Sequence, residues 1–110
     1  MRRARVLYKN EEAGILVQHD NGSFTFEYNE SWLLNQQKPS ISLSFPKSKK
    51  VFRSKHLFPV FYNMLPEGRN REAVVQLNRV DQDDHFGILT IVAKNDSIGA
   101  LRVVKETDDD

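Results

Sequence analysis

The sequence contains no cysteine among its 110 residues. Disulfide bridges, a thiolate nucleophile and cysteine-ligated zinc are therefore excluded. There is also no apolar run close to the roughly 20 residues that cross a bilayer as a helix. The basic start at residues 1–5 is not followed by the apolar segment of a signal peptide. We therefore expect a cytoplasmic protein.

Glycine is scarce as well, with five residues that stand singly. Isolated glycines do not form the glycine-rich loop that cradles phosphate groups. The sequence also lacks a Gly-x-Ser-x-Gly elbow and a His-Glu-x-x-His zinc motif. We therefore expect no catalytic residues, no cofactor and no metal site, and a protein that is not an enzyme.

The sequence has no large excess of charge of either sign, because its 16 Lys and Arg residues nearly balance its 15 Asp and Glu residues. This balance excludes a protein that is basic throughout, as many nucleic-acid binders are. Positive charge is nonetheless concentrated in residues 47–55, and residues 105–110 form an acidic tail. With 39% hydrophobic residues, the remaining length suits one globular domain at residues 1–104.

Five segments are predicted to be strands. The clearest is Ser23 to Tyr28, where three aromatic residues alternate with polar ones. Asn21-Gly22 before it is typical of a type I′ hairpin turn. The other predicted strands are residues 6–8, 13–19, 41–45 and 100–104, whereas residues 47–54 read as a long surface loop or a ragged edge.

Three helices are expected in the second half of the chain. Apolar residues at 57, 58, 61, 64 and 65 follow helical spacing with one buried face, and Ser54 is the predicted N-cap. Pro66 and Gly68 end this helix. Residues 69–78 form the second helix and residues 85–94 the third, with a shorter helical turn earlier in the chain at residues 32–34.

The order of these elements indicates the fold class. Strands come first, helices follow, and one strand returns at the end. This order predicts a single α+β domain with an antiparallel sheet of about five strands and two or three helices packed on one face.

The loop that ends the first long helix carries two charged residues, Glu67 and Arg69. A proline and a glycine make this loop stiff. Two interpretations stay open on the chemistry alone. Either Arg69 begins the next helix while Glu67 faces water, or the two charges bind a partner.

The basic run invites a phosphate-binding interpretation, but no array of exposed aromatic residues accompanies it. A solvated face is the simpler interpretation, with an acidic partner or nucleic acid as alternatives. The run consists of Lys47, Lys49, Lys50, Arg53 and Lys55.

Other candidate residues have structural interpretations. Asp81, Asp83, Asp84 and His85 match no EF-hand or zinc spacing, so the aspartates are better explained as helix caps. Trp32 is either part of the core or an interface anchor, and the core is favoured.

Four segments, taken in order, resemble the N-terminal subdomain of HipA-type toxin kinases. The resemblance runs from about Arg5 to Val104. One departure is Lys94, where the family often has a glycine. The segments are Gly22–Tyr28 with Trp32-Leu33, Ile41–Pro46, Phe61–Gly68 with Arg71, and Asp96–Leu101.

In HipA proteins a much longer kinase core follows this subdomain. A chain that carries the subdomain alone resembles the HipS antitoxins of three-component HipBST systems. The resemblance implies two partners: a separate HipT-like Ser/Thr kinase, which the antitoxin neutralises, and a HipB-like helix-turn-helix protein that binds DNA. DNA would then be contacted only through the complex.

The resemblance and the stiff loop together suggest which residues bind the kinase. We expect them to reach toward its ATP-binding side, because phosphoryl transfer depends on positioning and is blocked by obstruction. The expected partner-binding residues are Tyr62, Leu65, Pro66, Glu67, Gly68, Arg69 and Arg71.

Two alternative functions remain at this stage. The chain is a nucleic-acid-binding accessory subunit that uses the basic loop at residues 47–55, or it is an excised N-terminal piece of a HipA kinase.

Overall fold

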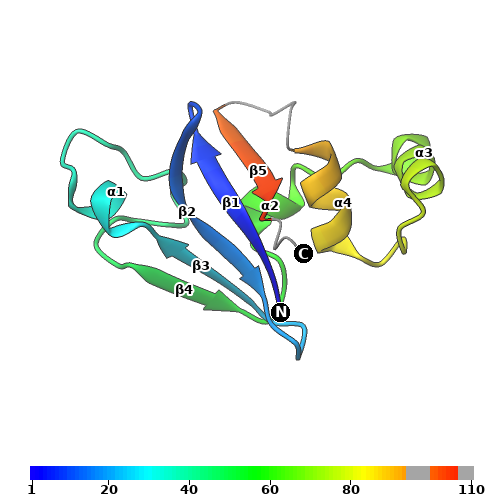
Figure 1. Ribbon diagram of the computed structural model, residues 1–110, viewed down its shortest axis with the longest axis horizontal. Coiled ribbons are helices and arrows are strands. Elements are labelled where there is room, and N and C mark those ends of the chain that lie inside the picture. The colour runs from blue at the N-terminus through cyan, green and yellow to red at the C-terminus, as the bar shows by residue number, and fades with distance from the viewer. Residues whose placement is uncertain (94–99, 107–110) are drawn as a thin grey trace.

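The computed structural model describes residues 1–93 and 100–106, which contain a five-stranded antiparallel sheet. The strand order is β4-β3-β2-β1-β5, so the last strand returns to lie beside the first (Figure 1). The predicted sheet is confirmed. The strands are β1 (Arg2–Tyr8), β2 (Glu11–Gln18), β3 (Phe24–Tyr28), β4 (Val51–Ser54) and β5 (Leu101–Lys105).

Four helices lie in the described part of the chain: α1 (Glu30–Leu34), α2 (Pro59–Tyr62), α3 (Gly68–Asn78) and α4 (His85–Val92). Helices α2 and α4 pack on one side of the sheet, and α3 lies beyond α4 at the end of the molecule (Figure 1). The α+β class is confirmed, with four helices in place of the two or three predicted. None of the described helices is long and apolar enough to cross a membrane.

The core lies between the sheet and α2 and α4. All three aromatic side chains of β3 face it, as their alternation predicts, and each is 5% exposed or less. Trp32 is 4% exposed and its Nε1 donates to the Pro39 carbonyl at 2.9 Å, so its predicted place in the core is confirmed.

A set of five phenylalanines, here called the aromatic cluster, joins the sheet to the segments that follow it. The ring of Phe26 on β3 stacks on Phe45 with centroids 4.5 Å apart. Phe45 in turn lies 5.0 Å from Phe52 on β4 and 5.0 Å from Phe58. Phe61 on α2 completes the cluster, 6.3 Å from Phe26. The cluster therefore fixes where α2 sits on the sheet.

The predicted strand at residues 41–45 is wrong, because this segment folds into turns. A strand would place Leu43 on the same face as Ile41 and Phe45, yet Leu43 is fully exposed while the other two are buried. The free edge of β3 is taken by β4 instead, with Phe26 opposite Phe52. The segment read as a loop or ragged edge is thus partly an edge strand.

The first long helix is shorter than predicted. Helix α2 begins at Pro59, with Phe58 as its N-cap, because proline suits the first helical position. The prediction of Ser54 as the cap is wrong, since Ser54 is the last residue of β4. The apolar positions are still mostly buried: Leu57, Phe58, Phe61 and Leu65 are each 9% exposed or less.

The β2–β3 hairpin is confirmed, but its turn is not of the predicted type. A type I′ turn needs positive φ at both central residues, and Gly22 has φ 90° whereas Asn21 does not. The Asn21 side chain instead accepts the Ser23 amide at 3.0 Å. Two successive positive φ values occur in the β1–β2 hairpin, at Lys9 (50°) and Asn10 (69°).

Some sequence predictions lie outside the described residues. These are the end of the third helix at Lys94, the family segment at residues 96–99 and the acidic residues 107–110. The remainder of the third helix is confirmed as α4, and the second helix is confirmed as α3.

We expect Tyr28→Phe to lower the free energy of unfolding by about 1–3 kcal/mol, because two buried backbone groups lose their partner. The Tyr28 hydroxyl donates to the Phe45 carbonyl and accepts the Ile41 amide at 3.1 Å, which fixes the loop on the sheet. Burial also raises the pKa of this hydroxyl. Urea unfolding would measure the loss. Tyr8→Phe, which removes a hydroxyl with no hydrogen bond among the described residues, is the control and should be nearly neutral.

Candidate partner-binding site

Residues 63–67 connect α2 to α3 in a short loop on the helix side of the molecule. The Met64 and Leu65 amides donate to the Phe61 and Tyr62 carbonyls at 3.0 Å, so the chain turns immediately after α2. Gly68 then has φ +59°, a conformation that glycine adopts without steric cost. The backbone angle is the reason that this position favours glycine. Space is not the reason, because a Cβ there would meet nothing within 4 Å.

The loop borders a cavity of about 350 Å³, here called the loop hollow. Six of the seven predicted partner-binding residues line it, and Arg69 does not. Three further residues, from the turn before α4 and its first residue, complete the wall. The lining residues are Tyr62, Leu65, Pro66, Glu67, Gly68, Arg71, Gln82, Asp83 and His85.

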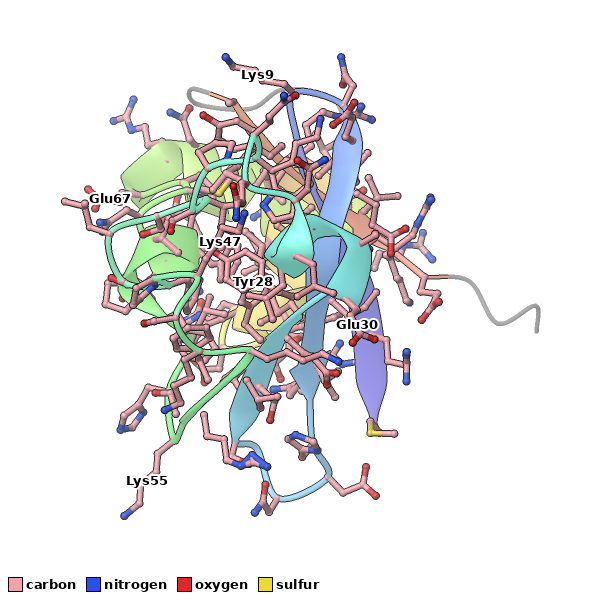
Figure 2. The ribbon with its side chains drawn as sticks, turned by 90° about the vertical axis from the view of Figure 1, so that its left-hand side faces the viewer. Lys9, Tyr28, Glu30, Lys47, Lys55 and Glu67 are labelled. Carbon is pink, nitrogen blue, oxygen red and sulfur yellow. The ribbon has the colours of Figure 1, made fainter. Side chains whose placement is uncertain are left out.

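The predicted residues differ in what they offer to a partner. Tyr62 is 51% exposed, and both Glu67 and Arg69 are exposed. Figure 2 shows the Glu67 side chain pointing away from the protein. The side chains of Glu67 and Arg69 make no ion pair or hydrogen bond with the described residues. Leu65, by contrast, is 9% exposed and supports the loop from below.

Arg71 is a bridge between the two walls of the loop hollow. Its Nη2 donates to the Gln82 carbonyl at 2.5 Å and contacts His85 Nδ1 at 3.1 Å. A guanidinium only donates, so Nδ1 of His85 is the acceptor in this contact. The His85 ring also packs edge-on against Tyr62, with centroids 5.5 Å apart. The predicted contact residue Arg71 is therefore engaged within the chain.

The sequence did not indicate that Gln82, Asp83 and His85 would join this site. They were interpreted as a turn and a helix cap about 15 residues beyond the loop, and no pattern in the sequence joins the two segments. Tyr62, Asp83 and His85 also border a second cavity of about 410 Å³ that reaches Lys55 and His56. These three side chains form the wall between the two cavities.

The turn before α4 is held to the sheet by Asp84. As predicted for an aspartate at this place, its Oδ1 caps α4 by accepting the Gly87 amide at 3.0 Å. Arg2 on β1 donates to both carboxylate oxygens, at 3.0 and 2.6 Å. The Arg2 guanidinium also lies 4.8 Å from the centre of the Phe86 ring. This bidentate contact fixes the start of α4, and with it His85.

The remaining candidate residues do not form a site. In residues 1–93 and 100–106, no group of three or more His, Asp or Glu side chains is placed to hold a metal ion. His19, which had no evident partner in the sequence, contacts Thr25 Oγ1 at 2.6 Å.

The basic run is not one continuous surface. Lys47 Nζ donates to the Asn35 and Lys38 carbonyls, each at 2.6 Å. Lys50 Nζ forms an ion pair with Glu27 Oε2 at 3.7 Å. Lys49 is positioned over the Phe52 ring at 5.5 Å. Two cations of the run, Arg53 and Lys55, have no hydrogen bond or ion pair with the described residues. A phosphate-tracking array at residues 47–55 therefore finds no support in the geometry.

The family model of the HipA N-terminal domain matches residues 4–104. The chain therefore belongs to the HipA N-terminal domain family, as the resemblance predicted. It is 32% identical over 106 residues to a Haemophilus influenzae protein named "Uncharacterized protein", covering 96% of this chain and 94% of that protein. It is 30% identical over 93 residues to "Putative kinase Y4mE" of Sinorhizobium fredii, covering 84% of this chain and 22% of that protein.

A solved structure described as the N-terminal domain of HipA toxin has the same fold. It superposes with a TM-score of 0.72 at 30% identity, covering 98% of this chain and 95% of that one. The relationship indicates a role connected with toxin–antitoxin systems, and it is a relationship to the N-terminal domain of HipA.

We expect Asp84→Asn to lower the free energy of unfolding by about 1 kcal/mol at neutral pH, because asparagine still caps a helix but loses the ion pair with Arg2. Hydrogen bonds from Arg2, with a smaller contribution from the Gly87 amide, hold the pKa of Asp84 below its usual value despite partial burial. A pKa that is lower in the folded than in the unfolded chain stabilises the fold above about pH 4. This contribution is lost as the pH falls through the folded pKa.

Denaturant unfolding from neutral pH to below about pH 4 would measure the difference in free energy of unfolding between wild type and variant. This difference should shrink on acidification. The double variant Arg2→Gln/Asp84→Asn should lose less than the sum of the two single losses. A difference that is unchanged at the lowest pH would contradict this account of the ion pair.

Proposed function

We propose that this chain is a HipS-type antitoxin that binds a separate HipT-like Ser/Thr kinase in trans and neutralises it. It acts in the cytoplasm, is not itself an enzyme, and works in a complex with a HipB-like helix-turn-helix protein that contacts DNA. Family membership supports the proposal. The Haemophilus influenzae relative, which matches along 94% of its length, indicates that a protein of this size recurs.

The relative named as a kinase adds a second line of support. In "Putative kinase Y4mE" the matched region is 22% of the protein, so the same domain belongs to a much longer chain with that name. Neighbouring domains within one chain commonly form an interface with each other. We infer that the separate domain uses such a surface between chains.

The observation that carries the proposal is the loop hollow with its exposed charges. Glu67 ends the loop and Arg69 lies in the first turn of α3, and the position of the loop is fixed by Leu65 below and by Pro66 within it. Neither charge is used by a described contact, so both are available to a partner. A stiff loop inserted beside the ATP-binding side obstructs closure or nucleotide placement, and phosphoryl transfer depends on both.

The seven predicted residues divide into two roles in this proposal. Tyr62, Glu67 and Arg69, with the backbone at Gly68, contact the kinase. Leu65, Pro66 and Arg71 position them, since Leu65 is buried and Arg71 bonds to the turn before α4.

Co-expression with the HipT-like kinase would test the proposal. We expect Glu67→Ala/Arg69→Ala to weaken the complex by about tenfold or more and to reduce growth rescue, because both charges lose their partners. Glu72→Ala/Arg79→Ala removes the same two residue types from the middle of α3 and from its C-cap, and is the matched control.

The control should bind and rescue as well as wild type. The dissociation constant from titration calorimetry separates binding from expression level in cells. The proposal is wrong if the Glu67→Ala/Arg69→Ala variant folds, binds the kinase and rescues growth as the control does.

A further inference from the structure

One face of the sheet is not covered by α2, α3 or α4, which all lie on the other side (Figure 2). Pairing across the sheet places side chains of four strands on this open face in one row. Arg3 is opposite Val17, Val17 is opposite Thr25, and Thr25 is opposite Arg53. Residues far apart in the sequence therefore line one surface.

This face contains a cavity of about 870 Å³, here called the open-face hollow, which is larger than the loop hollow of about 350 Å³. Its middle is formed by half-buried Val17, Thr25 and Val51. Arg3, Arg53 and Lys55 also line it. None of its lining residues lines the loop hollow, so the two surfaces are distinct.

The charges of the open-face hollow are unbalanced. Glu27 is the carboxylate in its lining, and it already lies 3.7 Å from Lys50. Arg3 Nε donates to Glu106 at 2.8 Å, but Arg53 and Lys55 have no hydrogen bond or ion pair with the described residues. A protein with a formal net charge of +1 thus holds an excess of cations around an apolar strip.

Protection of an edge strand does not account for the whole pattern. Charged residues on β4 do block pairing with another sheet. Arg3, however, lies on β1, which is paired on both sides. Edge protection therefore accounts for Arg53 and Lys55 but not for Arg3, which pairs with Glu106.

We propose that the open-face hollow is a second docking surface and that it takes an extended acidic segment of a protein partner. Apolar side chains of that segment rest on Val17, Thr25 and Val51. Its carboxylates meet the cations at the two sides of the hollow. Nucleic acid fits less well, because the aromatic residue in the lining, Phe24, is 5% exposed and offers no face for base stacking.

The test uses the full ¹⁵N-labelled chain and, as probe, a capped peptide of alternating aspartate and valine residues. We expect amide shifts in β1 to β4 around the hollow at low salt, and weaker binding at high salt. The variant Arg53→Glu/Lys55→Glu should bind the peptide about tenfold more weakly. Lys9→Glu/Arg79→Glu changes the net charge equally and is the control, since Lys9 lies at the opposite end of the molecule from Lys55 (Figure 2).

The control should bind the peptide within about twofold of wild type. An oligothymidylate with the same number of negative charges is the competing probe. Three results would overturn the proposal: no shifts around the hollow, equal loss in both variants, or tighter binding of the oligothymidylate than of the peptide.

Discussion

The packing of the aromatic cluster is the constraint on which the rest of the structure depends. Phe26 belongs to the sheet, Phe45 to the loop before β4, and Phe61 to α2. The centroids of their rings lie between 4.5 and 6.3 Å apart. Aromatic pairs of this kind contribute about 0.5–1.5 kcal/mol each beyond the area they bury. Since protein interiors are close-packed, a shift of one ring displaces the segments attached to the others.

Helix α2 shows why this constraint matters for function. A helix of four residues has no stability of its own, because nucleation costs more than so few hydrogen bonds return. Its place is therefore set by Phe58 and Phe61 in the cluster. Because Tyr62 is the last residue of α2, the position of α2 also sets the positions of Tyr62 and of the loop that follows. The other wall of the loop hollow is fixed separately, by the contact of Arg2 with Asp84.

The two proposed docking surfaces lie on different sides of the molecule. The helix side presents a stiff loop with one carboxylate and one guanidinium, and the open sheet face presents cations around an apolar strip. Helix α3 has no fully buried residue, although Val74 and Val75 pack against the edge of the core. The two proposals together imply a domain that contacts two partners at once.

Local patterns in the sequence were sufficient to predict many of the elements, much of the core and the position of the loop. Alternation identified β3 and its three core aromatics, and helical spacing identified the buried side chains from Leu57 to Leu65, although not the short length of α2. Pro66 and Gly68 marked the loop, because their backbone restrictions are local properties. Six of the seven predicted partner-binding residues line one hollow because they are close in sequence.

Contacts between distant segments were decided by the tertiary structure. Residues 41–45 have the alternation of a strand and residues 47–54 read as a loop or ragged edge, yet residues 51–54 are the ones that pair with β3. Arg71 and His85 meet because the chain after α3 turns back, so that the start of α4 lies beside the start of α3. Arg3 joins Arg53 because three intervening strand pairs carry the row across the sheet. The sequence by itself determined the elements and the stiff loop, whereas the fold decided which charges remain free, since pairing depends on proximity in space.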